Sequence, residues 1–302
     1  MQFFKTPNID FVGKRRAMLI GSAAVILIGL ASIAIQRGLR LSIDFAGGAL
    51  VEVQTETAVP LQDVRAIVSN AGFEGAEITR FGAENEYLIK VKSIANADST
   101  AKQIVAAIRQ GVGGQAVDLR RVETVGPKIG AELRTNALWA IVYSFIGILI
   151  YVGWRFDFRF AVASIIATAH DVFFTLAFFS FARIEISLGV LAALLTIVGY
   201  SLNDTVVVFD RIRENLHLRR REDFGKLVNT SINETLSRTV ITGTTTLLVL
   251  VSLMVLGGEV IKDFAITLFF GIVVGTYSSI FIAAPVVVEW NIWRPMKQQK
   301  KL

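Results

Sequence analysis

Long apolar stretches with almost no charge are the feature that most constrains this chain. Six of them cover residues 17–36, 135–154, 160–182, 186–209, 239–258 and 264–288. At a helical rise of about 1.5 Å per residue, each stretch can cross a hydrocarbon layer about 30 Å thick. The sequence therefore predicts six transmembrane helices.

The overall composition agrees with that prediction and removes most enzyme classes. Hydrophobic residues make up 53% of the 302 residues and charged residues 19%, whereas soluble domains have about 45–50% and about 25%. The chain has no cysteine, and its only histidines are His170 and His217. Disulfides, thiolate metal sites and cysteine nucleophiles are excluded, so we expect no catalytic residue, no cofactor and no metal site.

The first apolar stretch could also be a signal peptide, because Lys14, Arg15 and Arg16 precede it. It is longer than the apolar region of a signal peptide, and no convincing small-residue cleavage site follows it. We therefore expect an uncleaved membrane anchor.

Basic residues are distributed unevenly between the two sides of the predicted bundle. One side, which includes both termini, holds 17 of the 31 Lys and Arg residues, while the two short connections opposite hold only Arg183 and Lys262. The positive-inside rule then places both termini in the cytoplasm. The net charge of +6 indicates orientation and contact with anionic lipid, not nucleic-acid binding.

The basic run 219–221 belongs to a cytoplasmic connection, residues 210–238. Apolar residues such as Ile212 and Phe224 alternate with charge there, as expected of helices lying along the membrane surface. We therefore interpret the run as a solvated face beside the membrane.

Residues 37–134 form a long polar interval with 12 basic and 12 acidic residues. Alternating and helical patterns predict, in order, a strand, a helix, two strands, a helix and a strand. The segments expected are 49–55, 61–70, 77–81, 87–92, 99–110 and 117–124. This βαββαβ order is that of a ferredoxin-like α+β domain, and nothing in it indicates catalysis.

The chain is thus expected to be a polytopic α-helical membrane protein with one extracytoplasmic ferredoxin-like domain. The predicted segments are the N-terminus 1–16, span 17–36, folded domain with connectors 37–134, spans 135–154, 160–182 and 186–209, amphipathic connection 210–238, spans 239–258 and 264–288, and basic tail 289–302.

Asp204 is the strongest candidate for a functional residue, because a charge within the bilayer is costly and usually functional. It lies about 9 Å inside the cytoplasmic edge of its span, at a depth that Arg238 can reach from the next helix. Two interpretations are open: a carboxylate that binds and releases ions, which we favour, and a static ion pair that holds two helices together.

Asp171 is a second intramembrane carboxylate and follows His170 in the third span. A relay role and a helix-to-helix hydrogen bond are equally compatible with its position. Further polar residues near the two carboxylates could relay ions or join helices. They are Ser201, Asn203, Thr205, Thr239 and Thr242.

Several small or hydroxylated residues are better explained by close packing. Thr235 and Thr246 share a helical stripe with Thr239 and Thr242, and Gly271 and Gly275 form a G-x-x-x-G pair. Asp44, Gly47 and Gly48, and the stretch 126–130, lack the spacing of phosphate-binding loops. We interpret both glycine-containing stretches as turns that join the folded domain to its spans.

Several stretches, taken in order, resemble the SecD/SecF family of bacterial protein-export membrane proteins, within the resistance-nodulation-division superfamily. They are Ile43-Asp44-Phe45-Ala46-Gly47-Gly48, Val125-Gly126-Pro127, His170-Asp171-Val172, the polar run from Gly199 to Asn215, and Asn233-Glu234-Thr235-Leu236-Ser237-Arg238-Thr239. The resemblance covers nearly the whole chain, and the run from Gly199 to Asn215 is the most specific part. Ala46 stands where the family commonly has Thr.

The resemblance implies a function beyond what spacing can indicate. A chain of this family would reside in the bacterial inner membrane and pair with SecD, a related six-span subunit. The pair would assist the SecYEG channel, with YajC as a further partner, and would use the proton-motive force to draw preproteins out on the periplasmic side. The resemblance also assigns ion coupling to Asp204 and Arg238.

Other functions and ions stay open at this point. A small-molecule or lipid exporter could use the same helical bundle, and a purely structural assembly subunit is a third possibility. A single carboxylate serves H⁺ or Na⁺ equally well.

Overall fold

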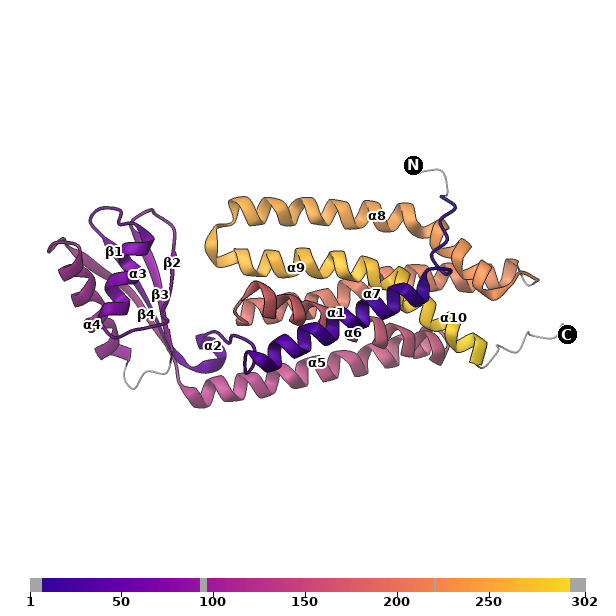
Figure 1. Cartoon of the computed structure of the whole chain (residues 1–302), viewed down its shortest axis with the longest axis horizontal. Helices are drawn as coiled ribbons and strands as arrows, with labels where there is room; N and C mark the ends of the chain where they lie inside the picture. Colours follow the sequence, from indigo (N-terminus) through magenta and orange to yellow (C-terminus); the bar gives the residue numbers. More distant parts are fainter. Residues whose placement is uncertain (1–6, 93–96, 220, 294–302) are drawn as a thin grey trace.

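The structure is a computed structural model that describes residues 7–92, 97–219 and 221–293. A helical bundle occupies most of its length, and a small domain built on a β-sheet lies at one end (Figure 1). The described parts of both chain ends lie at the opposite end. We call these two ends the sheet-domain end and the terminal end. The predicted basic residues Lys5, Arg220, Arg294, Lys297, Lys300 and Lys301 lie outside the described residues.

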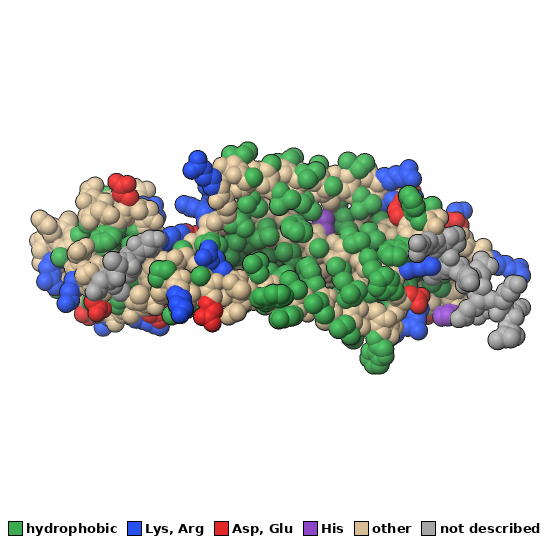
Figure 2. Space-filling model, turned by 90° about the horizontal axis from the view of Figure 1, so that it is seen from below, with side chains coloured by type: hydrophobic (Ala, Val, Ile, Leu, Met, Phe, Trp, Pro, Cys, Tyr) green, Lys and Arg blue, Asp and Glu red, His purple; other side chains and the backbone are tan. Residues whose placement is uncertain are grey.

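Within the described residues, six helices are long and apolar enough to cross a membrane. The first five are α1 (Arg15–Ile35), α5 (Pro127–Arg155), α6 (Phe158–Ala182), α7 (Leu188–Leu218) and α8 (Phe224–Leu256). The sixth consists of α9 (Gly258–Ser278), a π-helical turn η1 (Ser279–Ala283) and α10 (Ala284–Trp293). Figure 2 shows a broad hydrophobic belt over these helices, with charged side chains gathered toward the two ends. The prediction of a six-helix membrane protein is confirmed.

The helices differ in how much of their apolar surface the chain itself covers. In α6, α7 and the sixth helix, 44 to 61% of the apolar window is buried, against 11 to 17% in α1, α5 and α8. The first three therefore form the interior of the bundle. The other three leave most of their apolar surface to lipid or to a partner. This is possible because lipid tails are as apolar as these side chains, so no hydrophobic effect forces the chain to cover them.

The connection 210–238 differs from the prediction. It does not form separate helices along the membrane surface, because α7 continues to Leu218 and α8 already begins at Phe224. Ile212 and Leu227 are buried in the same core as the bundle interior. The apolar residues that suggested a surface helix instead continue the buried faces of two long helices.

The sheet domain has the predicted ferredoxin-like architecture. Strands β1 (Gly48–Thr55), β2 (Glu77–Arg80), β3 (Glu86–Lys92) and β4 (Val117–Val125) form an antiparallel sheet in the order β2-β3-β1-β4. Helices α3 (Leu61–Asn70) and α4 (Ala97–Gly111) complete the βαββαβ order. Inward-facing residues such as Val51, Tyr87 and Ile104 fill one continuous core.

The connectors between the sheet domain and the bundle are more structured than the predicted turns. Residues before β1 form a one-turn helix, α2 (Ile43–Ala46), and Pro127 begins α5, so 126–130 opens a helix. Gly47 has a φ of 78°, and a Cβ on Gly48 would lie 2.2 Å from the carbonyl oxygen of Val91. Glycine is required here because the connector passes directly against β3 and α5.

Candidate functional site

Asp204 lies on α7 with only 4% of its surface exposed. Its Oδ2 atom is fully buried and has no hydrogen-bond partner among the described residues. A buried carboxylate oxygen without a donor is costly. The position is therefore unfavourable for a permanently ionised side chain in this subunit alone.

Arg238 is the cation that the sequence analysis placed beside Asp204, but the two do not form a close pair. Antiparallel helices α7 and α8 are joined by Tyr200 to Thr246 at one level and by Asn215 to Ser231 at another. That register places Asp204 level with about residue 242, so Arg238 lies about one helical turn nearer the terminal end. Within the described part of the chain, no ion pair within 4.0 Å joins them.

The polar residues around this pair lie on two different faces. Asn203 and Arg238 are exposed, and Thr242 is half-buried, whereas Thr205 and Thr239 are buried. The hydroxyl of Thr242 donates to the carbonyl of Arg238, one turn earlier in its own helix. An uncovered polar edge therefore runs beside Asp204, on a face that the chain leaves open.

Asp171 has a contrasting environment at the centre of the bundle. It is fully buried, and its Oδ2 accepts hydrogen bonds from Ser201 Oγ at 2.5 Å and Ser278 Oγ at 2.8 Å. Its Oδ1 lies 3.0 Å from His170 Nδ1. The donors come from α6, α7 and α9, so Asp171 joins the three interior helices.

His170 extends this cluster toward α1. Its ring contacts Tyr277, whose hydroxyl lies 2.8 Å from Ser22 Oγ on α1. His170 Nε2 is buried and has no hydrogen-bond partner among the described residues.

Ser201 connects the surroundings of the two carboxylates. It lies three residues before Asp204, so both side chains occupy one face of α7. The structure thus brings Asp171, His170 and Ser201 into contact, with Asp204 one turn further along. Gly275 permits this approach, because a Cβ there would lie 3.0 Å from Ser201 Cβ.

Sequence reasoning did not identify Ser278 as a member of this cluster. A signal was present, because Thr276, Tyr277, Ser278 and Ser279 form a polar interruption within an otherwise apolar span. The interruption also runs into the π-helical turn η1, which begins at Ser279, and such turns are frequent at functional sites.

Glu234 is another residue that the sequence analysis did not single out. It accepts hydrogen bonds from Arg211 Nε at 2.6 Å, Asn215 Nδ2 at 2.8 Å and Arg219 at 3.1 Å. This cross-link holds α7 to α8 on the terminal side of Asp204, while Tyr200 holds them on the other side. The sequence did contain a signal for Glu234, because two polar motifs, 199–215 and 233–239, occur on the two helices that it joins.

Asp44 acts on the helix that carries Asp204. Its Oδ2 accepts a hydrogen bond from the backbone N–H of Leu188, the first residue of α7, at 2.9 Å. A carboxylate is favourable there because helix N-termini carry unpaired N–H groups and partial positive charge. Asp44, Gly47 and Gly48 therefore connect the sheet domain to the start of α7.

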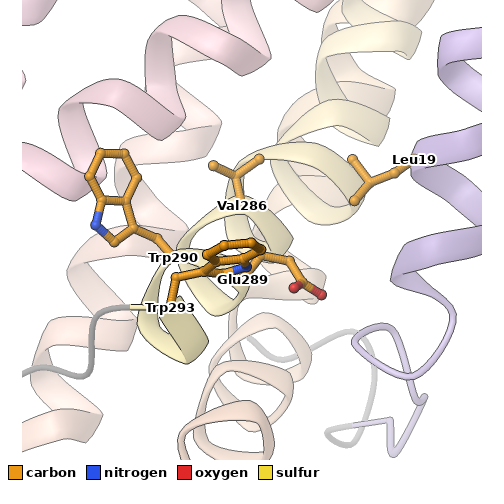
Figure 3. A pocket seen from close by; sticks show the side chains of 5 residues that line it. All are labelled: Leu19, Val286, Glu289, Trp290 and Trp293. Carbon is orange, nitrogen blue, oxygen red and sulfur yellow. The ribbon is translucent and has the colours of Figure 1, made fainter.

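A groove of about 420 Å³ lies at the terminal end, lined by Leu19, Val286, Glu289, Trp290 and Trp293 (Figure 3). It contains none of the predicted site residues. Glu289 at its edge binds Arg15 at 2.8 Å. The described residues contain no group of three or more His, Cys, Asp or Glu side chains that could hold a metal ion.

Fold and site together define a class: a polytopic α-helical membrane protein with one folded domain outside the bilayer and buried carboxylates within it. The family model described as protein export membrane protein SecD/SecF, C-terminal, matches residues 104–293. The model of the SecD/SecF GG motif matches residues 33–59. The chain belongs to the SecD/SecF family of protein-export membrane proteins.

Individual relatives are similar along nearly the whole chain. Protein translocase subunit SecF of Desulfurispirillum indicum is 44% identical over 289 residues, which cover 94% of this chain and 92% of the relative. Protein translocase subunit SecDF of Thermus thermophilus is 41% identical over 98% of this chain but only 40% of its own length. A crystal structure of the Thermus SecDF, titled a translocon-associated membrane protein, has a TM-score of 0.82 and 40% identity over 96% of this chain and 40% of its own.

Proposed function

We propose that this chain is an ion-driven subunit of the bacterial protein-export machinery. It acts with SecD in the inner membrane, with both termini in the cytoplasm, and promotes movement of preproteins through SecYEG and their release on the periplasmic side. Asp204 binds the coupling ion, which we take to be H⁺. The buried Oδ2 of Asp204, which has no hydrogen-bond partner among the described residues, is the observation that carries the proposal.

The immediate surroundings of Asp204 support an ion-binding role over a static ion pair. A static pair needs direct contact to offset the cost of burying charge, and Arg238 is about one helical turn away and exposed.

The open face beside Asp204 supports pairing with a second helical bundle. Asn203 and Arg238 are exposed there, and most of the apolar surface of α8 is uncovered. The SecDF relative contains a region similar to this chain within a longer polypeptide. A carboxylate contributed by SecD would then face Asp204 across the interface.

Protonation of Asp204 changes the packing of the two bundles, because a neutral side chain no longer needs Arg238 or water. That change moves the sheet domain through the Asp44 connection to α7. One elementary charge that crosses 100 mV releases about 2.3 kcal/mol, enough to shift a conformational equilibrium by more than tenfold.

The test is preprotein translocation into vesicles that contain SecYEG, SecA, SecD and this chain, with and without an imposed proton gradient. Asp204→Asn keeps the size of the side chain and cannot release a proton. We expect normal assembly, unchanged translocation without a gradient, and loss of the stimulation that the gradient produces in the wild type. A sodium gradient imposed in its place identifies the ion.

Asp210→Asn is the matched control. Asp210 lies on the same helix, but it is exposed and pairs with Arg155 at 3.4 Å. Its replacement should leave the stimulation intact. Equal gradient dependence in Asp204→Asn and wild type contradicts ion coupling and favours the purely structural role.

A small-molecule or lipid exporter is the alternative function. An exporter of that kind needs a cavity in its external domain, and the core of the sheet domain is filled by side chains such as Val53, Tyr87 and Ile89. Protein export therefore has the better support.

A further inference from the structure

The sheet domain touches the bundle through a group of charged side chains that the proposed ion coupling does not use. Lys92, at the end of β3, forms an ion pair with Glu185 at 2.5 Å. Glu185 lies in the short loop between α6 and α7. The same loop is held to the connector after α1, because Ile186 exchanges backbone hydrogen bonds with Arg40 and Ser42.

A second acidic residue lies beside this ion pair. Glu77 on β2 is opposite Lys90 on β3, and the two are joined at 3.2 Å. Lys90 and Lys92 are two residues apart on one strand, so they project from the same face of the sheet, away from its core. The carboxyl group of Glu77 therefore lies next to that of Glu185.

One oxygen of Glu185 is unsatisfied unless a proton is present. Oε1 accepts from Lys92, but Oε2 is fully buried and lacks a donor among the described residues. The neighbouring Glu77 carboxylate can donate a hydrogen bond only when it is protonated, because an ionised carboxylate only accepts. A proton shared between the two carboxyl groups would supply the donor that Oε2 lacks, and these groups belong to different parts of the molecule.

We propose that Glu77 and Glu185 form a proton-binding site that latches the sheet domain to the bundle. With the shared proton, Glu77 donates to Glu185, and Lys90 and Lys92 neutralise the remaining charge. Without it, two carboxylates repel each other at close range and the buried oxygen loses its donor. Loss of the proton therefore releases the sheet domain from the α6–α7 loop.

The electrostatics of the pair agree with that arrangement. Burial and the adjacent Glu185 raise the pKa of Glu77, against the opposing effect of Lys90. Burial would also raise the pKa of Glu185, but hydrogen bonding from Glu77 and the contact with Lys92 outweigh it, so the pKa of Glu185 is lowered. Glu77 is therefore the residue that carries the proton.

The pH dependence of the latch follows from these two directions. The contribution of Glu77 to docking is complete below the usual pKa of a glutamate and is lost as pH rises through the raised value. The contribution of Glu185 is present above the usual pKa and is lost as pH falls through the lowered value. Docking is therefore strongest in the acidic window between them and weakens toward neutral and alkaline pH.

The latch shares no residue with the proposed ion site at Asp204. With both termini in the cytoplasm, as proposed above, the latch faces the periplasm, from which protons enter. Acidification of the periplasm therefore favours the docked sheet domain. Asp204→Asn should keep the response of the latch to pH, which separates a failure of this proposal from a failure of the proposed function.

The test uses the full chain in lipid nanodiscs and exploits its lack of cysteine. Spin labels on Glu84→Cys, in the exposed β2–β3 turn, and Leu256→Cys, at the exposed end of α8, report the distance between the two parts. Pulsed electron resonance is recorded from about pH 8 to about pH 5, above the usual pKa of glutamate. We expect a short, narrow distance at acidic pH and a broad, longer distribution at alkaline pH.

Glu77→Gln supplies a permanent donor in place of the proton. We expect the docked distance at every pH, whereas Glu185→Gln, which loses the ion pair with Lys92, should be undocked at every pH. If the docked state binds the proton ten times more tightly than the undocked state, the wild-type docking constant changes by about tenfold over the pH range in which the proton is lost.

Glu123→Gln on β4 is the matched control, because that exposed residue pairs only with Arg121 among the described residues. It should keep the wild-type pH response. A wild-type distance that does not change with pH, or a Glu77→Gln variant that responds as wild type does, overturns the proposal.

Discussion

Asp171 and Asp204 are both buried within the helical bundle, and their surroundings differ in almost every respect. Asp171 lies at the junction of α6, α7 and α9, where Ser201, Ser278 and His170 all approach it. Asp204 lies on α7, one turn beyond Ser201 and beside an open face. Its Oδ2 is buried and has no donor among the described residues. One polar group is satisfied within this chain, and the other is not.

The difference indicates which carboxylate is built for stability and which for exchange. A buried group whose hydrogen bonds are complete resists change, because every alternative leaves donors unpaired. A buried group with an unfilled position can gain a proton or a partner at little cost. The contrast also separates the tightly packed side of α7, toward α9, from the side toward α8.

The largest effect should come from removing the Asp171 carboxylate. Asp171→Ala leaves the Ser201 hydroxyl and His170 without an acceptor, whereas Ser278 keeps the carbonyl of Gly275. We expect a loss of about 2–5 kcal/mol in stability. Asp204→Ala should cost less than about 1 kcal/mol, because the removed oxygen has no hydrogen bond to lose.

Thermal unfolding of both purified variants in detergent measures this difference. Variants with equal losses would show that the two environments are equivalent and would break the comparison.

Packing on the two sides of α7 should differ by a smaller amount. A Cβ on Gly271 would lie 2.1 Å from Ile197 Cδ1, whereas a Cβ on Gly199 has no neighbour within 4 Å. Gly271→Ala should therefore destabilise the protein by about 1–3 kcal/mol. Gly199→Ala should stabilise it by up to about 1 kcal/mol, because alanine favours the helix.

The same unfolding measurement applies to this pair, with the order of the two midpoints as the readout. A Gly271→Ala variant at least as stable as Gly199→Ala would mean that α7 and α9 are not tightly packed.

The smallest effect concerns the few polar contacts between α7 and α8. Tyr200→Phe keeps the ring and removes hydrogen bonds to the Thr242 carbonyl at 3.2 Å and the Thr246 hydroxyl at 3.1 Å. We expect a loss of about 1 kcal/mol. Faster hydrogen exchange in α8, measured by mass spectrometry, should accompany it, and unchanged exchange would show that these bonds do not hold the open side together.

Much of the fold was predictable because its elements are set by local patterns. Alternation of apolar and polar residues placed β1 and β3 within one residue of their observed starts, and Pro60 with Gly72 delimited α3. Charge-free length alone revealed six membrane helices. Helix ends at the terminal side were less predictable, because α7 and α8 bury apolar residues beyond the membrane boundary.

The site was predictable only in part. Burial of Asp204 and Asp171 followed from their position in apolar stretches. The sequence placed Arg238 at a depth similar to that of Asp204, whereas the register of α7 and α8 places it about one helical turn away. The contact of Ser278 with Asp171, and that of Asp44 with the start of α7, join residues more than 100 positions apart. No local periodicity records such a contact.

By itself, the sequence determined that this chain lies in a membrane, how many times it crosses and which carboxylates are buried, because hydrophobic length and charge act locally along a helix. Only the tertiary structure decided which of those carboxylates is satisfied and which is left open. That distinction depends on the donors that neighbouring helices bring within hydrogen-bonding distance, and α9 and α8 bring very different ones.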